Sequence, residues 1–210
     1  MRLFNTLFFG SAMAWSTAAD ATKYTFDETG SAVTFHNTAS LHGIDGVAAQ
    51  FGGSFDSDAG TGSLVVQTKS MTTNLGPRDK KMHEFCLESD KYPTIEFAVT
   101  GVGGGVEGLK AKAKRGKVVL NGTLKIRDTK KTVSVPTSFV TVGDDLTLQG
   151  QLDFNWQEYN VPDPSILIST LYPDMSVKFS LRLKGEPAPA APAAPADPTE
   201  EAAAQEAPAE

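Results

Sequence analysis

Residues Asp145–Gln157 read DLTLQGQLDFNWQ and alternate apolar with polar side chains over their whole length. The apolar positions, interrupted once by Gly150, are Leu146, Leu148, Leu152, Phe154 and Trp156. A period of two places these side chains on one face of a β-strand and the polar ones on the other. The segment Met175–Lys184, MSVKFSLRLK, repeats the pattern. A sheet with one apolar face must close on itself or pack against a second sheet.

The same alternation recurs in shorter runs along the chain, separated by turns rich in Gly, Pro and Asp. These runs predict eight or nine strands, and their short connections favour antiparallel pairing. One run is expected to place four side chains on a common face: Val47, Ala49, Phe51 and Phe55. The fold class is therefore all-β, and periodicity alone fits both a sandwich and a closed barrel.

Two connections differ from tight turns. Residues 78–91 carry Met82, Phe85, Cys86 and Ser89 at helical spacing, which predicts a short helix. Residues 162–173 form an apolar segment that could cover an open end of the sheet.

The two ends of the 210-residue chain differ in composition from its middle. Residues 1–21 combine Arg2, a short apolar stretch and small residues, which is typical of a secretory signal peptide. Residues 186–210 consist almost entirely of Pro, Ala and acidic residues, so we expect a disordered tail. Residues 22–185 remain as a single domain, and we expect a periplasmic or secreted protein.

The formal charge of −6 resides in the tail, so the predicted domain is close to neutral. Without a basic excess, nothing points to nucleic acid as a partner. The single cysteine, Cys86, excludes an intrachain disulfide or a CxxC site. His36, His42 and His83 show no metal-ligand spacing, and the sequence lacks a GxSxG motif, so neither a metal site nor a serine hydrolase is predicted.

The segment Arg78–Phe97, RDKKMHEFCLESDKYPTIEF, resembles the signature of the YceI family in its RD start, short helix and YPTIxF strand. Residues 120–130 resemble the family's GxLTIRGVTK hairpin, and the pieces 154–161 and 177–181 resemble its C-terminal strands. The likeness extends from about Lys23 to Lys184 in the expected order.

This resemblance implies a lipocalin-like, extended, eight-stranded antiparallel β-barrel with one or two short helices. It also implies a long hydrophobic tunnel for a polyisoprenoid or another long-chain lipid, no catalytic residues and no cofactor beyond a bound isoprenoid such as a quinone-like lipid. Family members are often dimeric, so a homodimer and peripheral membrane contact are further expectations. The implied function is a carrier or storage protein that shields its lipid from water.

The aromatic residues at inward positions are the candidate tunnel lining: Phe35, Phe51, Phe55, Phe97, Phe139, Phe154, Trp156 and Phe179. Periodicity alone favours a solid core made of these same residues, and the alternative function is then a secreted stress or surface scaffold with a plugged barrel. A hydrolase or isomerase acting on the lipid is a third hypothesis. Arg78 and Asp79 are expected either to form a buried pair that latches the helix or to line the tunnel mouth.

Overall fold

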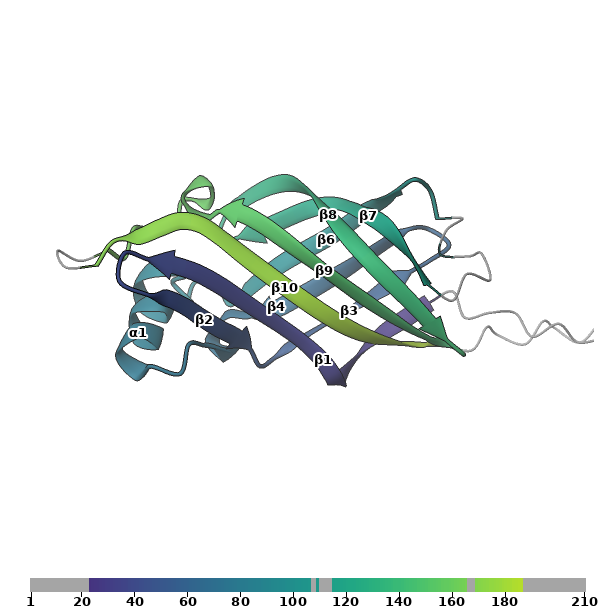
Figure 1. The fold of residues 1–210 in the computed structure, drawn as a ribbon, viewed down its shortest axis with the longest axis horizontal. Coiled ribbons are helices and arrows are strands. Elements are labelled where there is room, and N and C mark those ends of the chain that lie inside the picture. Colours follow the sequence, from purple (N-terminus) through teal and green to yellow (C-terminus); the bar gives the residue numbers. More distant parts are fainter. Residues whose placement is uncertain (1–22, 107–108, 110–114, 166–168, 187–210) are drawn as a thin grey trace, which may run out of the picture.

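The computed structural model describes residues 23–106, 109, 115–165 and 169–186, which form an antiparallel β-barrel with a helix at one end (Figure 1). Its strands are β1 (Lys23–Ala39), β2 (Gly43–Ala48), β3 (Phe51–Asp56), β4 (Thr61–Gln67), β5 (Met71–Thr72), β6 (Thr94–Gly103), β7 (Arg115–Ile126), β8 (Thr129–Val142), β9 (Asp145–Asn155) and β10 (Leu171–Gly185). The helical segments are α1 (Gly76–Lys81), a π-helical turn (Met82–Cys86) and two 3-10 turns (Thr68–Ser70 and Trp156–Tyr159). The predicted signal peptide and the acidic tail from residue 187 lie outside the described residues and stay predictions.

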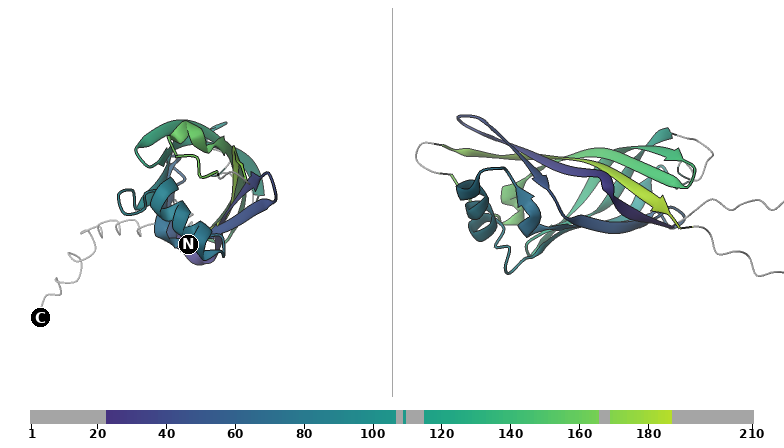
Figure 2. Two further views of the ribbon diagram at one scale, coloured as in Figure 1. Left: turned by 90° about the vertical axis from the view of Figure 1, so that its left-hand side faces the viewer. Right: turned by 90° about the horizontal axis from the view of Figure 1, so that it is seen from below.

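The barrel closes because β10 pairs with both β9 and β1. The closed ring contains the eight strands β1, β3, β4, β6, β7, β8, β9 and β10, each antiparallel to its neighbours. The view along the barrel in Figure 2 shows this ring, with α1 in front of one side of its opening. Because the ring is closed, none of its strands is an edge strand. The fold is therefore a closed barrel and not a sandwich.

Strands β2 and β3 follow one another along β1 as one bent strand. β2 pairs with the second part of β1, and β3 pairs with its first three residues. The prediction that Val47 and Ala49 share the inward face of Phe51 is wrong. Val47 and Ala49 are exposed, whereas Ala48 and Phe51 are buried. The bend between the two strands shifts the phase of the alternation by one residue, which periodicity alone does not reveal.

The helical connection is fastened to the barrel wall through Arg127. This residue lies in the turn between β7 and β8, with a φ of 56°. Its guanidinium donates to Glu88 Oε2 at 2.5 Å and to the carbonyl oxygen of Asn160 at 2.7 Å. One side chain therefore joins the α1–β6 connection, the β7–β8 hairpin and the turn that follows β9.

Several of the inward aromatic rings lie against glycines of neighbouring strands. Four of these pairs are directly opposite each other in the strand register: Phe35 with Gly46, Phe55 with Gly62, Phe139 with Gly116, and Phe179 with Gly150. A methyl group added at Gly150 would lie 2.5 Å from Phe179 Cζ, and one at Gly116 would lie 2.6 Å from Phe139 Cε1. Each ring therefore occupies the space that a side chain larger than glycine would fill on the opposite strand. The rings thus lie along the barrel wall.

Replacement of Gly46 by Ala tests this packing. The new methyl group would overlap the Phe35 ring, so the ring must move. We expect the free energy of unfolding to fall by about 1–3 kcal/mol, as for other overpacked cores. Gly52→Ala is the matched control, because a methyl group at Gly52 meets nothing within 4 Å. Equal denaturation midpoints for the two variants would contradict the proposed ring packing.

Candidate functional site: an apolar cavity inside the barrel

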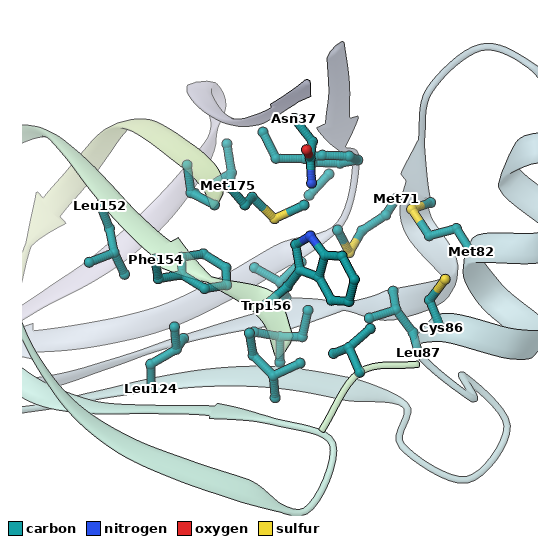
Figure 3. Close-up of a pocket in the computed structure, with 18 of the residues that line it drawn as sticks. Asn37, Met71, Met82, Cys86, Leu87, Leu124, Leu152, Phe154, Trp156 and Met175 are labelled. Atoms are coloured by element: carbon teal, nitrogen blue, oxygen red, sulfur yellow. The ribbon is translucent and has the colours of Figure 1, made fainter. Parts of the chain in front are cut away.

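The barrel encloses a cavity of about 570 Å³ that is lined almost entirely by apolar side chains. This volume lies within the range of about 300–1,000 Å³ found for small-molecule sites. The lining comes from strands all around the ring, from α1 and the turn after it, and from the segment that precedes β10. Figure 3 shows one region of the cavity, in which Trp156 lies between Leu152 and Phe154 on one side and Met71, Met82 and Leu87 on the other.

Most of the predicted aromatic residues face this cavity. Six line it: Phe35, Phe55, Phe97, Phe154, Trp156 and Phe179. The other two, Phe51 and Phe139, are buried in the surrounding core but are not among the cavity-lining residues. Contact of a ligand with any of these residues stays a prediction.

Sequence reasoning missed a group of lining residues close to the helix, three of which are methionines: Met71, Met82, Cys86, Leu87 and Met175. Met175 carried a usable signal, because it belongs to the alternating run that also contains Phe179. Met71 lies in the two-residue strand β5, which is too short to show alternation, and the other three lie in or next to the π-helical turn, where a period of two gives no information. Unbranched Met side chains adapt to irregular shapes, so this part of the wall fits a ligand of variable shape.

The cavity reaches the surface at the end of the barrel that carries α1. His42, Leu75 and Pro77 all line the cavity, yet each of them is exposed to solvent. His42 lies between β1 and β2, whereas the other two lie at the start of α1. Pro164 and Ser165, from the segment expected to cover an open end, also line the cavity, and Lys81 Nζ donates to the carbonyl oxygen of Pro164 at 2.6 Å. Ile166–Ile168 of that segment lie outside the described residues.

Arg78 and Asp79 latch the helix, but through Thr73 and not as an ion pair. Arg78 Nε donates to Thr73 Oγ1 at 2.7 Å, and an Arg78 terminal nitrogen donates to the Thr73 carbonyl oxygen at 2.9 Å. The Asp79 carboxylate accepts from Thr72 Oγ1 at 2.6 Å, from Thr73 N at 2.8 Å and from the Thr73 hydroxyl. Arg78 also lines the cavity, so it is both part of the latch and part of the wall.

The latch sets the pKa of Asp79. Burial favours the neutral acid and raises the pKa, but the hydrogen bonds from Thr72 and Thr73 stabilise the carboxylate, and the net pKa lies below the ordinary 3.8. A carboxylate with a lowered pKa stabilises the fold above its unfolded pKa, and this contribution is lost as the pH falls through the folded value.

Asp79→Asn tests the latch. The amide has one acceptor in place of two, so the Thr72 and Thr73 donors cannot all be satisfied. We expect a loss of about 2 kcal/mol in the free energy of unfolding at neutral pH. In urea titrations at successively lower pH, the difference between wild type and variant should shrink below pH 3.8. A difference that is independent of pH would show that the charge of Asp79 plays no part.

Cys86 is buried in the wall of the cavity. Burial raises the pKa of its thiol to about 11, so the thiol is protonated and unreactive at neutral pH. His36 is exposed on the outer face, with Nδ1 2.7 Å from Asp45 Oδ1. Within the described residues, His, Cys, Asp and Glu side chains form no group of three that could hold a metal ion.

The structure and the cavity define a hollow, lipocalin-like antiparallel barrel. The model of the YceI-like domain matches residues 24–183, and the chain belongs to the YceI family. This confirms the resemblance drawn from Arg78–Phe97. No curated protein sequence matches the chain.

Solved structures share the fold at low sequence identity. A polyisoprenoid binding domain from Saccharophagus degradans, implicated in plant cell wall breakdown, is 15% identical with a TM-score of 0.68, and the match covers 80% of this chain and 100% of that domain. BcnA from Burkholderia cenocepacia is 18% identical with a TM-score of 0.63, over 75% of this chain and 98% of that protein. At these identities the similarity establishes the fold alone.

Proposed function

We propose that this protein binds a long-chain isoprenoid or fatty lipid inside the barrel and shields it from water without chemical conversion. The observation that carries the proposal is the apolar cavity of about 570 Å³ within a closed barrel. The ligand named for the Saccharophagus degradans domain, a polyisoprenoid, supports the same assignment.

Burial of hydrocarbon supplies enough free energy for useful affinity. Each buried CH₂ group contributes about 0.8 kcal/mol, so a few isoprene units supply roughly 10 kcal/mol before the costs of ordering are subtracted. Association and ordering remove several kcal/mol of this, so a few isoprene units bind only in roughly the high micromolar range, and each further unit of five carbons adds about 4 kcal/mol. The Met side chains and the rest of the apolar wall provide the surface against which this hydrocarbon is buried.

A plugged scaffold is the alternative function, and the size of the cavity favours the carrier over it. In a plugged barrel, the inward aromatic side chains would fill the lumen. Phe35 and Phe179 instead lie over Gly46 and Gly150, and space remains between the walls. A hydrolase or isomerase acting on the lipid gains no support from the buried, protonated Cys86 thiol.

The proposal also covers the cellular location, the membrane contact and the oligomeric state of the protein. We propose a periplasmic or secreted carrier on the basis of residues 1–21. A peripheral membrane contact would allow lipid to enter at the α1 end, where Leu41, Leu75 and Phe85 are large, exposed apolar residues. The homodimer stays a prediction that sedimentation of the purified protein can check.

Val177→Trp tests carriage of a lipid. Val177 faces the cavity from β10, so an indole there fills the lumen, whereas its neighbour Lys178 is exposed and makes Lys178→Trp the matched control. Native mass spectrometry of the protein after mild extraction should detect bound lipid in wild type and in the control. We expect bound lipid to fall at least about tenfold in Val177→Trp, since the new side chain displaces several CH₂ groups.

Circular dichroism of both variants verifies that the barrel is folded. The carrier function would be refuted if the wild-type protein were found without lipid and also took up no lipid from mixed vesicles. Unchanged lipid in folded Val177→Trp would place the lipid outside this cavity.

A further inference from the structure

A buried amide side chain, that of Asn37, interrupts the apolar wall of the cavity. Asn37 occupies an inward position on β1, in the series Val33, Phe35, Asn37 and Ala39, and only 3% of its surface is exposed. Its partners across the neighbouring strands are Ile44 on β2 and Met175 on β10, which also line the cavity. An amide in such surroundings is costly unless each of its polar atoms forms a hydrogen bond.

The orientation of this amide is fixed by the backbone. Asn37 Oδ1 accepts a hydrogen bond from the Thr38 N–H at 2.6 Å, and because an N–H donor must face an oxygen, Nδ2 occupies the other position. Figure 3 shows Nδ2 directed from the wall towards the interior, on the side of Trp156. Among the described residues, Nδ2 is buried and has no hydrogen-bond partner.

Four other polar groups that line this part of the cavity are already paired, those of Trp156, Thr73, Arg78 and Lys81. Trp156 Nε1 donates to the carbonyl oxygen of Tyr172 at 2.9 Å. The Thr73 hydroxyl is shared between Arg78 and Asp79, and the Lys81 ammonium donates to Pro164. Asn37 Nδ2 is therefore a hydrogen-bond donor available to a ligand, whereas these neighbouring groups already form hydrogen bonds within the protein.

We propose that Asn37 Nδ2 binds a neutral carbonyl-type oxygen on the ligand, such as the oxygen of a ketone, quinone, ester or amide. This inference rests on the proposed function and narrows its ligand class from any hydrocarbon to a long apolar chain that carries an uncharged acceptor. A carboxylate is disfavoured at this depth, because its desolvation among Ile44, Met175 and Trp156 costs more than one amide donor returns. An oxygen held by Asn37 fixes how far the chain slides into the barrel.

Asn37→Leu tests the assignment with two probes. Farnesylacetone has an isoprenoid chain that ends in a ketone, whereas farnesene is an isoprenoid hydrocarbon without oxygen. We expect Asn37→Leu to weaken farnesylacetone binding about tenfold and to leave farnesene binding unchanged or slightly stronger, because only the ketone loses a hydrogen bond. Met175→Leu, a conservative change in the residue opposite Asn37, is the matched control and should affect the two probes equally.

Displacement of a fluorescent apolar dye from delipidated full-length protein measures both affinities. Circular dichroism of each variant verifies that the barrel is folded, because the substitution also removes the acceptor of the Thr38 N–H, and Asn37→Ala provides the same comparison if leucine distorts β1. Equal losses for both probes, or no loss for either, would overturn the role of Asn37, as would a site in which water satisfies Nδ2. Failure of both probes to bind wild type would instead refute the carrier function itself.

Discussion

The structure depends on the contact between an inward phenylalanine ring and a glycine on the adjacent strand. An eight-stranded barrel is narrow, and its interior is easily filled by its own side chains. Here Phe35, Phe55, Phe139 and Phe179 each face a glycine in the strand register. The glycines allow the rings to lie along the wall, so large apolar side chains stabilise the sheet and still leave a lumen.

The end that carries α1 serves a different purpose from the wall. Thr73 holds both Arg78 and Asp79, and the helix thereby covers part of the opening without closing it. Leu75, exposed and in contact with the cavity, shows that the lumen continues to the surface there. A closed wall together with adaptable Met side chains near the opening suits a binder that must admit a long chain and then enclose it.

Much of this architecture could be predicted from the sequence. Alternation over Asp145–Gln157 and Met175–Lys184 identified β9 and β10 with the correct inward faces. Helical spacing predicted a short helix within residues 78–91, but the structure places α1 earlier, at Gly76–Lys81, and only a π-helical turn follows it at Met82–Cys86. The bend between β2 and β3 could not be predicted, because it depends on how one strand pairs along two parts of β1. The latch through Thr73 was missed for a similar reason, since nothing local marks this threonine as the partner of Arg78 and Asp79.

The choice between a hollow and a solid barrel could not be made from periodicity, because the same phenylalanines fit both. Whether the barrel is hollow depends on the register between neighbouring strands, because the register decides whether a ring lies opposite a glycine or another large side chain. A crystal of delipidated protein under xenon pressure tests the central claim most directly, since xenon enters empty apolar cavities. We expect xenon inside the barrel, bounded by Phe35, Phe97 and Phe179. A lumen without xenon, with these rings turned into its centre, would contradict it.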